Sequence, residues 1–412
     1  MDFTYHYSEE QERFRKEVRA WLEKNIPEEM KEPIDGRDLN DEQYERYYYF
    51  WREKRREMAA KGWLWPTLPK QFDGGGLTPE HETILGEEFA RYQASYGNGT
   101  TAFLVSTLLV WATEEQRQKF LVPILKHERI CIQALTEPQS GSDLANILST
   151  AVRDGDDWII NGQKAFQGHP PDADWIMGPI LTDPGAPRHR NLGFFVIPAN
   201  DPGVIFQRTR TMNGDRQNFI FYDNVRVPGD HLIGGDHQGW QVVNTTLEQE
   251  HGGRGRVAAR DEDTENLLAY LQGLRAREDL AQERPIIHQK AMENYIASHL
   301  DAFFSDRNYW MYQTRQEMSY HGSQQTLWSK VTGVERAERG RDIMNLYAML
   351  GTRDPRALFG GRPETFQRSS LTRVHPGGTV EIQKVIIARR IGISRTPERA
   401  PPTPATATSF AS

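Results

Sequence analysis

The change of residue pattern along the chain constrains the fold more than any other feature of the sequence. Up to residue 129, apolar residues recur at helical spacing, and Ser8 with Gln11 has the residue types of a helix capping box. From residue 130 to 227, short runs rich in Ile, Val, Phe and Trp alternate with Gly, Asp and Asn turns, which is typical of antiparallel strands. Helical spacing returns after Gly239. This order predicts separate α and β domains rather than alternating βαβ units.

We therefore expect an α+β fold that is mainly α. Its expected parts are a helical domain over residues 1–129, a mostly antiparallel β-domain over 130–236, a helical bundle over 237–395 and a disordered tail over 396–412. The tail is rich in Pro, Ala and Thr, which disfavours a packed structure. After the first helix, the expected helices lie at 41–62, 79–95, 100–112, 240–275, 285–318, 324–350 and 380–391. The expected strands lie at 130–135, 158–160, 175–181, 193–197 and 219–227.

Composition excludes several classes of protein. The formal net charge of −7 argues against a general nucleic-acid binder, which needs a basic surface. No apolar run approaches the roughly 20 residues that span a bilayer, and the acidic, polar N-terminus does not resemble a signal peptide. The single cysteine, Cys131, excludes internal disulfides, and the histidines lack metal-binding spacing, so no metal site is expected. We expect a soluble, cytoplasmic protein with Cys131 as an inert core residue.

The segment from Ala134 to Asp143 carries the strongest signal for chemistry. An expected strand runs there into a loop crowded with Thr, Ser and Gly. Such a loop offers free backbone N–H groups and small hydroxyls, which suit a ring edge or a pyrophosphate. From these residues alone, an ordinary surface loop is the other interpretation.

This segment contains LTEPQSGSD, which resembles the signature of the acyl-CoA dehydrogenase family of flavoproteins. Further motifs of that family occur in the family's order over about residues 3 to 394. They are Gly62-Trp63 with Gly74-Gly75-Gly76, Asn161-Gly162-Gln163-Lys164, Val225-Arg226-Val227-Pro228, Gly239-Trp240 and Gly377-Gly378-Thr379. The resemblance implies an N-terminal helical domain, a central β-domain and a C-terminal four-helix bundle.

The resemblance also implies FAD as cofactor, an acyl-CoA thioester as substrate and an electron-transferring flavoprotein as electron acceptor. It implies a homo- or hetero-oligomer, either a dimer or a tetramer. The implied reaction is α,β-dehydrogenation, in which a carboxylate removes the α-proton while a hydride leaves the β-carbon for the flavin. This chemistry needs a positioned base, a hydride acceptor and donors that stabilise the enolate oxygen.

The catalytic base of many relatives has no counterpart at its usual place. That position, directly before the last Gly-Thr of the C-terminal signature, is Gly377 in this chain. Some relatives carry the base on the first helix of the C-terminal domain, and the matching residue is Glu250, which we interpret as the base. Glu248 is the alternative, although it points elsewhere on a helix. Gly377 keeps the backbone N–H that the family uses as an enolate donor, and its missing side chain leaves room for a bulky, branched or cyclic acyl group.

The resemblance also assigns the contacts to FAD. Phe166 takes the place of a flanking Trp, whereas Gly168 replaces a Ser or Thr whose hydroxyl lies near flavin N5. The remaining positions at the ring edge, the pyrophosphate and the C-terminal signature are Gln133, Leu135, Thr136, Gly141, Ser142, Thr379 and Glu381.

Part of the family's FAD site is not kept. The Arg and Phe-Gly pattern that relatives supply from a neighbouring subunit is missing around residues 275–284, and the second Gly is missing from the later loop that begins at Gly351. Two alternatives therefore stay open. One is a flavin-poor, non-catalytic subunit of a heteromeric acyl-CoA dehydrogenase, and the other is a flavin oxidase or monooxygenase of the same fold.

Overall fold

A computed structural model describes residues 7–33, 35–97, 101–168, 170, 172–251, 261–275, 285–314 and 316–394. The tail that the sequence predicts to be disordered lies outside these residues, so its disorder stays a prediction. The structure has helices at both ends of the chain and strands between them, which confirms the α+β class.

The first part of the chain is helical. Its helices are α1 (Glu9–Asn25), α2 (Asp41–Ala60), α3 (Pro79–Arg91), α4 (Thr101–Trp111), α5 (Glu114–Gln116) and α6 (Val122–Leu125). The predicted capping box of α1 is confirmed. Ser8 Oγ accepts a hydrogen bond from the backbone N–H of Gln11 at 3.2 Å, and Gln11 Oε1 accepts one from the backbone N–H of Ser8 at 2.8 Å.

An eight-stranded sheet follows these helices. Its strands are β1 (Cys131–Gln133), β2 (Thr150–Asp154), β3 (Asp157–Gly168), β4 (Trp175–Leu181), β5 (Leu192–Pro198), β6 (Val204–Arg210), β7 (Arg216–Val227) and β8 (Leu232–Ile233). They are ordered β6-β7-β3-β2-β4-β5-β8, with β1 beside β4. Pairing is antiparallel except between β1 and β4 and between β2 and β4, so the mostly antiparallel sheet is confirmed. Strands β2, β6 and β8 were not predicted.

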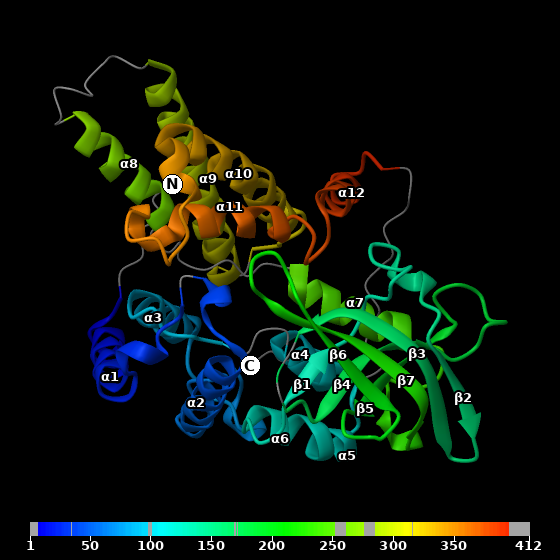
Figure 1. Cartoon of the computed structure of the whole chain (residues 1–412). Helices are drawn as coiled ribbons and strands as arrows, with labels where there is room; N and C mark the ends of the chain where they lie inside the picture. The colour runs from blue at the N-terminus through cyan, green and yellow to red at the C-terminus, as the bar shows by residue number, and fades with distance from the viewer. Residues whose placement is uncertain are drawn as a thin grey trace.

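The last part of the chain is helical again. Its helices are α7 (Gly239–His251), α8 (Glu262–Arg275), α9 (Pro285–Gln313), α10 (His321–Met344), α11 (Arg362–Arg373) and α12 (Val380–Arg390). Helices α8 to α11 form a bundle, and α12 lies beside α10 (Figure 1). The single helix predicted over 240–275 corresponds to α7 and α8, and residues 252–260 between them are not among the described residues. Helix α11 was not predicted, although the Pro363 in its first turn suits a helix start.

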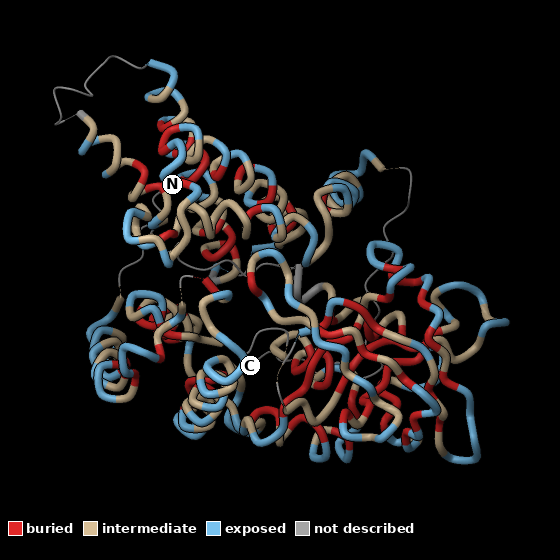
Figure 2. The backbone as a smooth tube through the Cα atoms, in the orientation of Figure 1, coloured by how far each residue is buried: buried red, intermediate tan, exposed pale blue. Residues whose placement is uncertain are grey.

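The buried residues fall into three clusters of unequal size. The largest joins the N-terminal helices to one face of the sheet and includes Leu108 of α4, Phe194 of β5 and Val242 of α7. A second lies within the β-domain, whereas the bundle has a small cluster made of Leu267, Ala291, Ile343, Met344 and Ala348. Figure 2 shows the same contrast, because buried positions concentrate in the strands and the bundle helices are mostly intermediate or exposed. Among the described residues, no helix has both the length and the apolar character needed to cross a membrane.

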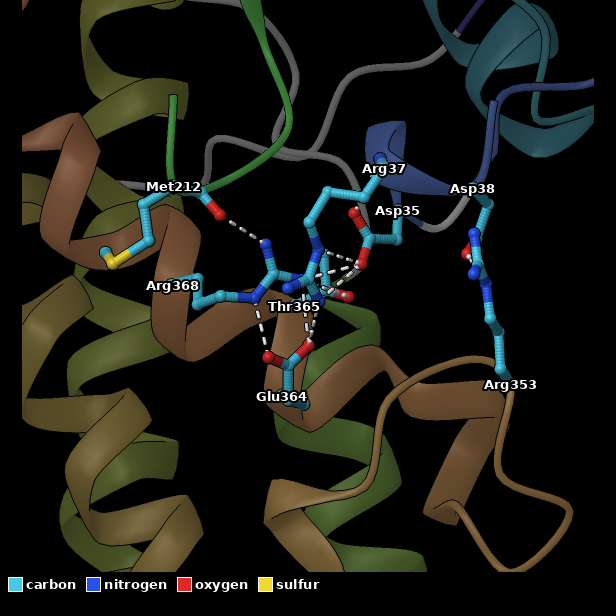
Figure 3. A network of polar contacts seen from close by, with 8 residues as sticks. All are labelled: Asp35, Arg37, Asp38, Met212, Arg353, Glu364, Thr365 and Arg368. Atoms are coloured by element: carbon cyan, nitrogen blue, oxygen red, sulfur yellow. Dashed lines mark hydrogen bonds and ion pairs between the residues drawn. The ribbon is translucent and has the colours of Figure 1, made fainter. Parts of the chain in front are cut away.

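A network of ion pairs ties the three parts of the chain together (Figure 3). Asp35 comes from the N-terminal part, Met212 from the turn between β6 and β7, and Glu364 and Arg368 from α11. Arg368 donates to the Asp35 carboxylate at 2.7 Å, to the Met212 carbonyl at 2.9 Å and to both Glu364 oxygens at 2.6 and 2.8 Å. Arg37 contacts Asp35 at 2.8 Å and Glu364 at 3.0 Å. We call these five residues the Asp35 clamp.

Candidate active site

The loop that carries the LTEPQSGSD motif stands on a buried ion pair. Lys164 Nζ lies 2.9 Å from Glu137 Oε1, and both side chains are shielded from solvent. The same ammonium donates to the carbonyl oxygens of Pro179 at 2.9 Å and Leu135 at 3.4 Å. The Glu137 carboxylate also accepts the backbone N–H of Leu148 at 2.6 Å. These buried bonds anchor the loop to β3, β4 and the segment before β2, so the backbone on either side of Glu137 is held in one conformation.

The electrostatics of Glu137 follow from these partners. Burial alone would raise the pKa of Glu137, but the Lys164 charge and the backbone N–H of Leu148 stabilise the carboxylate more. The pKa of Glu137 is therefore held below its usual value. Both Glu137 and Lys164 belong to the family motifs in the sequence, but their pairing was not predicted.

A β-bulge in β3 lies against this loop. The pairing of β3 with β7 shifts by one residue between Lys164 and Gln167. Within the bulge, Phe166 adopts a positive φ of 61°. The residue is 59% exposed, and its ring contacts that of Phe219 at 5.3 Å between centroids. A non-glycine residue in this conformation stores strain, and such residues and bulges cluster at functional sites. The exposed ring is therefore fixed at the place where the family resemblance puts the flavin.

Hydrogen bonds join the bulge to the motif loop. The backbone N–H of Ala165 donates to the Thr136 carbonyl at 2.8 Å. The side-chain amide of Gln167 donates to the Ala165 carbonyl and, at 3.4 Å, to the Thr136 carbonyl. The structure thus places the Thr136 carbonyl beside Ala165 and Gln167, the two neighbours of Phe166. Gln167 has a local structural role that sequence reasoning missed.

Gln133 provides a direct sign that a polar group belongs at this site. Its side chain is 7% exposed, and its Nε2 has no hydrogen-bond partner among the described residues. An unsatisfied buried donor costs about 1–3 kcal/mol, so a ligand acceptor here would remove a real penalty. Leu135 is half-buried, whereas Gly141 and Ser142 are exposed. The residues present therefore fit the edge of a flavin ring and the start of its polar chain.

Gly168 is the last residue of β3, and the space beside its Cα is open. A Cβ atom placed on it would meet nothing within 4 Å. Relatives carry a side-chain hydroxyl at this position. Among the described residues, no other atom occupies the place of that side chain in this structure. His169, which follows it, lies outside the described residues.

Helix α7 carries the predicted base and is bound to α4. Thr107 Oγ1 and Thr246 Oγ1 are 2.7 Å apart, and Trp111 Nε1 donates to Thr245 Oγ1 at 2.8 Å. The helix begins at Gly239 directly against β5, where a Cβ would lie 2.5 Å from the Gly193 carbonyl carbon. Glu250 follows Thr246 by four residues, near the end of α7.

The side chain of the predicted base is not described. The same holds for Glu248 and His251. The choice between Glu250 and Glu248 therefore stays a prediction.

The loop around Gly377 is held by Lys330, which sequence reasoning missed, and by Gln383, which belongs to the C-terminal signature but whose bond to the loop was not predicted. Lys330 of α10 donates to the carbonyl oxygens of Arg373 at 3.0 Å, Val374 at 3.3 Å and Pro376. Gln383 of α12 donates to the Gly377 carbonyl at 2.8 Å. All of these bonds use carbonyl oxygens, so they leave the N–H of Gly377 for other partners.

The conformation of Gly377 explains why glycine suits this position. Its φ is 65°, and that of Gly378 is 78°. A glutamate at 377 would have to adopt the left-handed conformation, which costs roughly 1–2 kcal/mol for a residue with a Cβ. The usual base of the family is therefore disfavoured here by the backbone as well as replaced in the sequence.

Thr379 and Glu381 lie at the start of α12. The Thr379 hydroxyl caps this helix by accepting the backbone N–H of Ile382 at 3.3 Å, and Glu381 is exposed in the first turn. Helix α12 stands apart from the sheet in Figure 1. Within one chain, these two residues are therefore not brought to the motif loop.

Two further expectations concern cysteine and metals. Cys131 is buried in β1, and burial raises the pKa of its thiol, so the expectation of an inert core residue fits its surroundings. In the described parts of the chain, no cluster of three or more His, Cys, Asp and Glu side chains could hold a metal ion.

Comparison with known proteins gives matches to one family over most of the chain. The model described as "Acyl-CoA dehydrogenase, N-terminal domain" matches residues 8–128, and "Acyl-CoA dehydrogenase, middle domain" matches 132–225. Acyl-CoA dehydrogenase IpdE1 of Mycobacterium tuberculosis is 31% identical over 288 residues, which cover 68% of this chain and 72% of that protein. Acyl-CoA dehydrogenase FadE26 of the same organism is 27% identical over 391 residues, which cover 92% and 96%. In the solved ChsE4-ChsE5 complex from Mycobacterium tuberculosis, one chain is 25% identical with a TM-score of 0.77, covering 95% of this chain and 100% of that one.

Proposed function

This chain belongs to the acyl-CoA dehydrogenase family of oxidoreductases, and from that premise we propose that it dehydrogenates an acyl-CoA thioester with FAD as its cofactor. The observation that carries the cofactor assignment is the buried amide nitrogen of Gln133, which has no partner among the described residues and lies on the strand that leads into the Thr136 loop. The exposed ring of Phe166, fixed in the bulge bonded to that loop, supports it.

The residues proposed to hold FAD are those of the motif loop and the bulge. Gln133, Leu135 and Thr136 would contact the edge of the ring, and Gly141 with Ser142 would offer backbone N–H groups to the pyrophosphate. FAD, when bound, supplies the acceptor for the two electrons that leave the substrate. Thr379 and Glu381, which one chain does not bring to this loop, would contact the cofactor of a neighbouring subunit.

Residues of α7 and of the Gly377 loop are proposed to remove the α-proton and to stabilise the thioester oxygen. Glu250 is proposed to remove the α-proton of the thioester. The N–H of Gly377 is proposed to donate to the thioester oxygen, where negative charge develops as the α-proton leaves. Rigid supports are needed for both roles, and the Thr107–Thr246 bond and the Lys330 and Gln383 contacts provide them.

The acyl group is proposed to be bulky, branched or cyclic. Two positions where relatives carry side chains, 168 and 377, are glycines in this chain. The missing side chain at Gly377 leaves room for the acyl group where many relatives carry a glutamate. Equal or better kcat/KM for a short straight-chain thioester than for a branched or cyclic one would contradict this assignment.

An oligomer is proposed from an apolar face of the bundle. Met292, Ile296, Leu300 and Phe303 of α9 lie on one side of the helix at positions i, i+4, i+8 and i+11, and all four are exposed. The opposite side of α9 packs into the small cluster of the bundle through Ala291. Light scattering of the purified chain tests the assembly state, and Ile296→Asp is expected to lower the mass if this face is the contact.

The first experiment is an anaerobic titration of the purified protein. Its visible absorption spectrum is recorded before and after adding a panel of acyl-CoA thioesters. A yellow protein that one class of thioester bleaches would support the proposal and identify the substrate class. The Glu250→Gln variant is expected to keep its flavin and resist bleaching, with Glu248→Gln as the matched control.

A second candidate is a flavin-poor subunit of a heteromer. The glycine at 168 favours it, because the usual hydroxyl near the flavin is missing, and so does the loss of the second Gly from the loop that begins at Gly351. A solved relative that is itself a complex of two different chains is consistent with it. A colourless protein that takes up no FAD alone but binds a related chain would support this candidate instead. For the catalytic dehydrogenase, the proposed electron acceptor is an electron-transferring flavoprotein. Rapid oxidation of the reduced enzyme by oxygen would instead favour a flavin oxidase or monooxygenase of the same fold.

A further inference from the structure

A small cavity lies between helices α8, α9, α10 and α11 of the bundle, and its volume is about 30 Å³. Each of the four helices contributes a charged or amide side chain to its wall. These side chains are Asp263, Asn294, Arg336 and Arg362. None of them belongs to the family motifs or to the proposed catalytic and cofactor sites. The proposed function therefore does not explain this space, which we call the bundle cavity.

Three buried polar atoms of the residues that line this cavity have no hydrogen-bond partner among the described residues. They are Asn294 Oδ1, Arg336 Nε and Arg362 Nε. Asn294 is 3% exposed and the Arg336 side chain is 10% exposed, so bulk water does not satisfy them. Buried polar atoms in folded proteins nearly always have a partner, either a protein group or an ordered water molecule. Three unpartnered atoms around one cavity therefore indicate a polar occupant.

Other contacts of the same side chains leave these three atoms available. Asn294 donates its Nδ2 to the backbone carbonyl of Arg336 at 3.0 Å, so its Oδ1 remains as an acceptor. Arg336 pairs with Asp261 through a terminal nitrogen, and Arg362 pairs with Glu262 in the same way at 3.0 Å. Each planar guanidinium is thus held at its end, while its Nε–H remains a donor. The wall of the cavity therefore offers two donors and one acceptor.

This combination of groups selects a neutral occupant that both accepts and donates hydrogen bonds. An anion could accept from the two guanidinium groups, but Asn294 Oδ1 and the Asp263 carboxyl would oppose it. A cation would face two arginines. Water accepts and donates, so it can bond the two Nε–H groups and the amide oxygen. Asp263 Oδ1 lies 3.7 Å from Arg362 Nε, which is too long for a hydrogen bond, and a water molecule bonded to both atoms would bridge them.

The size of the cavity agrees with water. A volume of about 30 Å³ holds roughly one or two water molecules and is far below the roughly 150 Å³ of a cavity that binds benzene. Part of the space exists because Gly340 of α10 has no side chain, and a Cβ placed there would meet nothing within 4 Å. Since Cβ atoms tilt toward the N-terminus of a helix, a side chain at 340 would lean toward Arg336, one turn earlier.

We propose that the bundle cavity is a binding site for water, with one molecule or a bonded pair held as a fixed part of the structure. The water accepts from Arg336 Nε and Arg362 Nε and donates to Asn294 Oδ1, so it joins α10, α11 and α9. Its bond to Asp263 adds α8. The apolar cluster of the bundle is small, so these polar bonds contribute to holding the four helices together. This inference does not depend on the proposed function.

The direct test is a high-resolution crystal structure of the purified protein, with a second crystal soaked in sodium bromide. Bromide scatters anomalously, so it reports any site that takes an anion. The expected result is a water peak within hydrogen-bond distance of Asn294 Oδ1, Arg336 Nε and Arg362 Nε, with no bromide peak in the cavity. An empty cavity would overturn the proposal, and a bromide peak there would replace water by an anion.

A second test measures the contribution of the water in solution. Gly340→Val and Gly340→Thr introduce side chains of similar size that displace it, but only Thr supplies a hydroxyl that can take over its bonds. Gly333→Val and Gly333→Thr are the matched controls. Gly333 is two turns earlier on α10, has equally open space at its Cβ position and is not among the residues that line the cavity. The measured quantity is the midpoint of thermal unfolding.

At position 340, the Thr variant is expected to unfold at least about 2 °C above the Val variant. At position 333, the two variants should differ by less than about 1 °C, because Val and Thr have similar helix propensities. Equal midpoints for the two variants at 340 would refute the water bridge, since they would indicate that only the added volume matters. If neither variant at 340 folds, the two crystal structures of the wild type decide the question.

Discussion

Removing Arg368 from the Asp35 clamp is expected to destabilise the protein at the junction of its three parts. In Arg368→Met, the Asp35 carboxylate loses the partner at 2.7 Å, the Met212 carbonyl loses its donor and Glu364 loses a two-pronged contact. The Asp35 side chain is only 2% exposed and that of Arg368 is 11% exposed, so water cannot replace these bonds well. Asp35 keeps Arg37 at 2.8 Å.

The expected magnitude follows from that burial. Removing one partner of a buried ion pair costs about 3–5 kcal/mol, and the remaining Arg37 contact places this case near the lower end, at about 3 kcal/mol. Urea unfolding at neutral pH, followed by circular dichroism, measures the loss. Arg356→Met is the matched control, because Arg356 pairs with Asp354 on the surface and its side chain is 73% exposed. We expect no measurable change in the control.

A double-mutant cycle isolates the pair itself. Asp35→Asn is combined with Arg368→Met, and the coupling free energy is expected to exceed about 1 kcal/mol. A coupling near zero, or a loss in Arg368→Met no larger than in Arg356→Met, would refute the reasoning. The stabilisation should also depend on pH. Burial would raise the pKa of Asp35, but the Arg37 and Arg368 charges hold it below its usual value. A lowered pKa stabilises the fold above the pKa of the unfolded chain, so the difference between wild type and Arg368→Met should shrink as the pH falls below about 4.

Four further outcomes are expected. Glu250→Gln should lower kcat by at least about 100-fold with flavin retained, as measured by anaerobic bleaching, and full activity would exclude Glu250 as the base. Glu137→Gln should cost about 3–5 kcal/mol in urea unfolding, because it leaves the buried Lys164 charge without its partner, and a loss below about 1 kcal/mol would contradict this. Because the pKa of Glu137 is lowered, its stabilisation should also be lost only as the pH falls through that lowered pKa, which thermal unfolding from pH 7 to 3 would detect. Gly377→Ala should lower stability by about 1 kcal/mol because of the positive φ, whereas an unchanged unfolding midpoint would show that the loop adapts.

Local patterns in the sequence predicted the elements that local physics decides. The capping box of α1 and the strands of the β-domain core were visible in residue types and spacing. Strand β6 (Val204–Arg210) was missed because charged Arg208 and Arg210 obscure its alternation. The bulge at Phe166 was missed because a positive φ in an aromatic residue has no signature in sequence.

Contacts between distant segments explain most of what was missed at the site. Asp35 and Arg368 are separated by 333 positions, and no local pattern relates them. Lys330 holds the Gly377 loop from another helix. The sequence could identify the motif residues, because those resemble a family, but not the side chains that support them.

The position of α7 has a consequence for synthesis of the chain. Helix α7 follows the sheet in sequence, yet Val242 and Val243 complete the buried cluster that Leu108 and Phe194 begin. While the ribosome has released only the residues before 239, one face of α4 and one face of the sheet lack their cover. Since domains generally fold from the N-terminus as they emerge, this one would wait for α7 before closing. A nascent chain of which only the first 236 residues have left the ribosome should therefore expose an apolar surface and be a target for chaperones, and one released past residue 251 should bury that surface under α7.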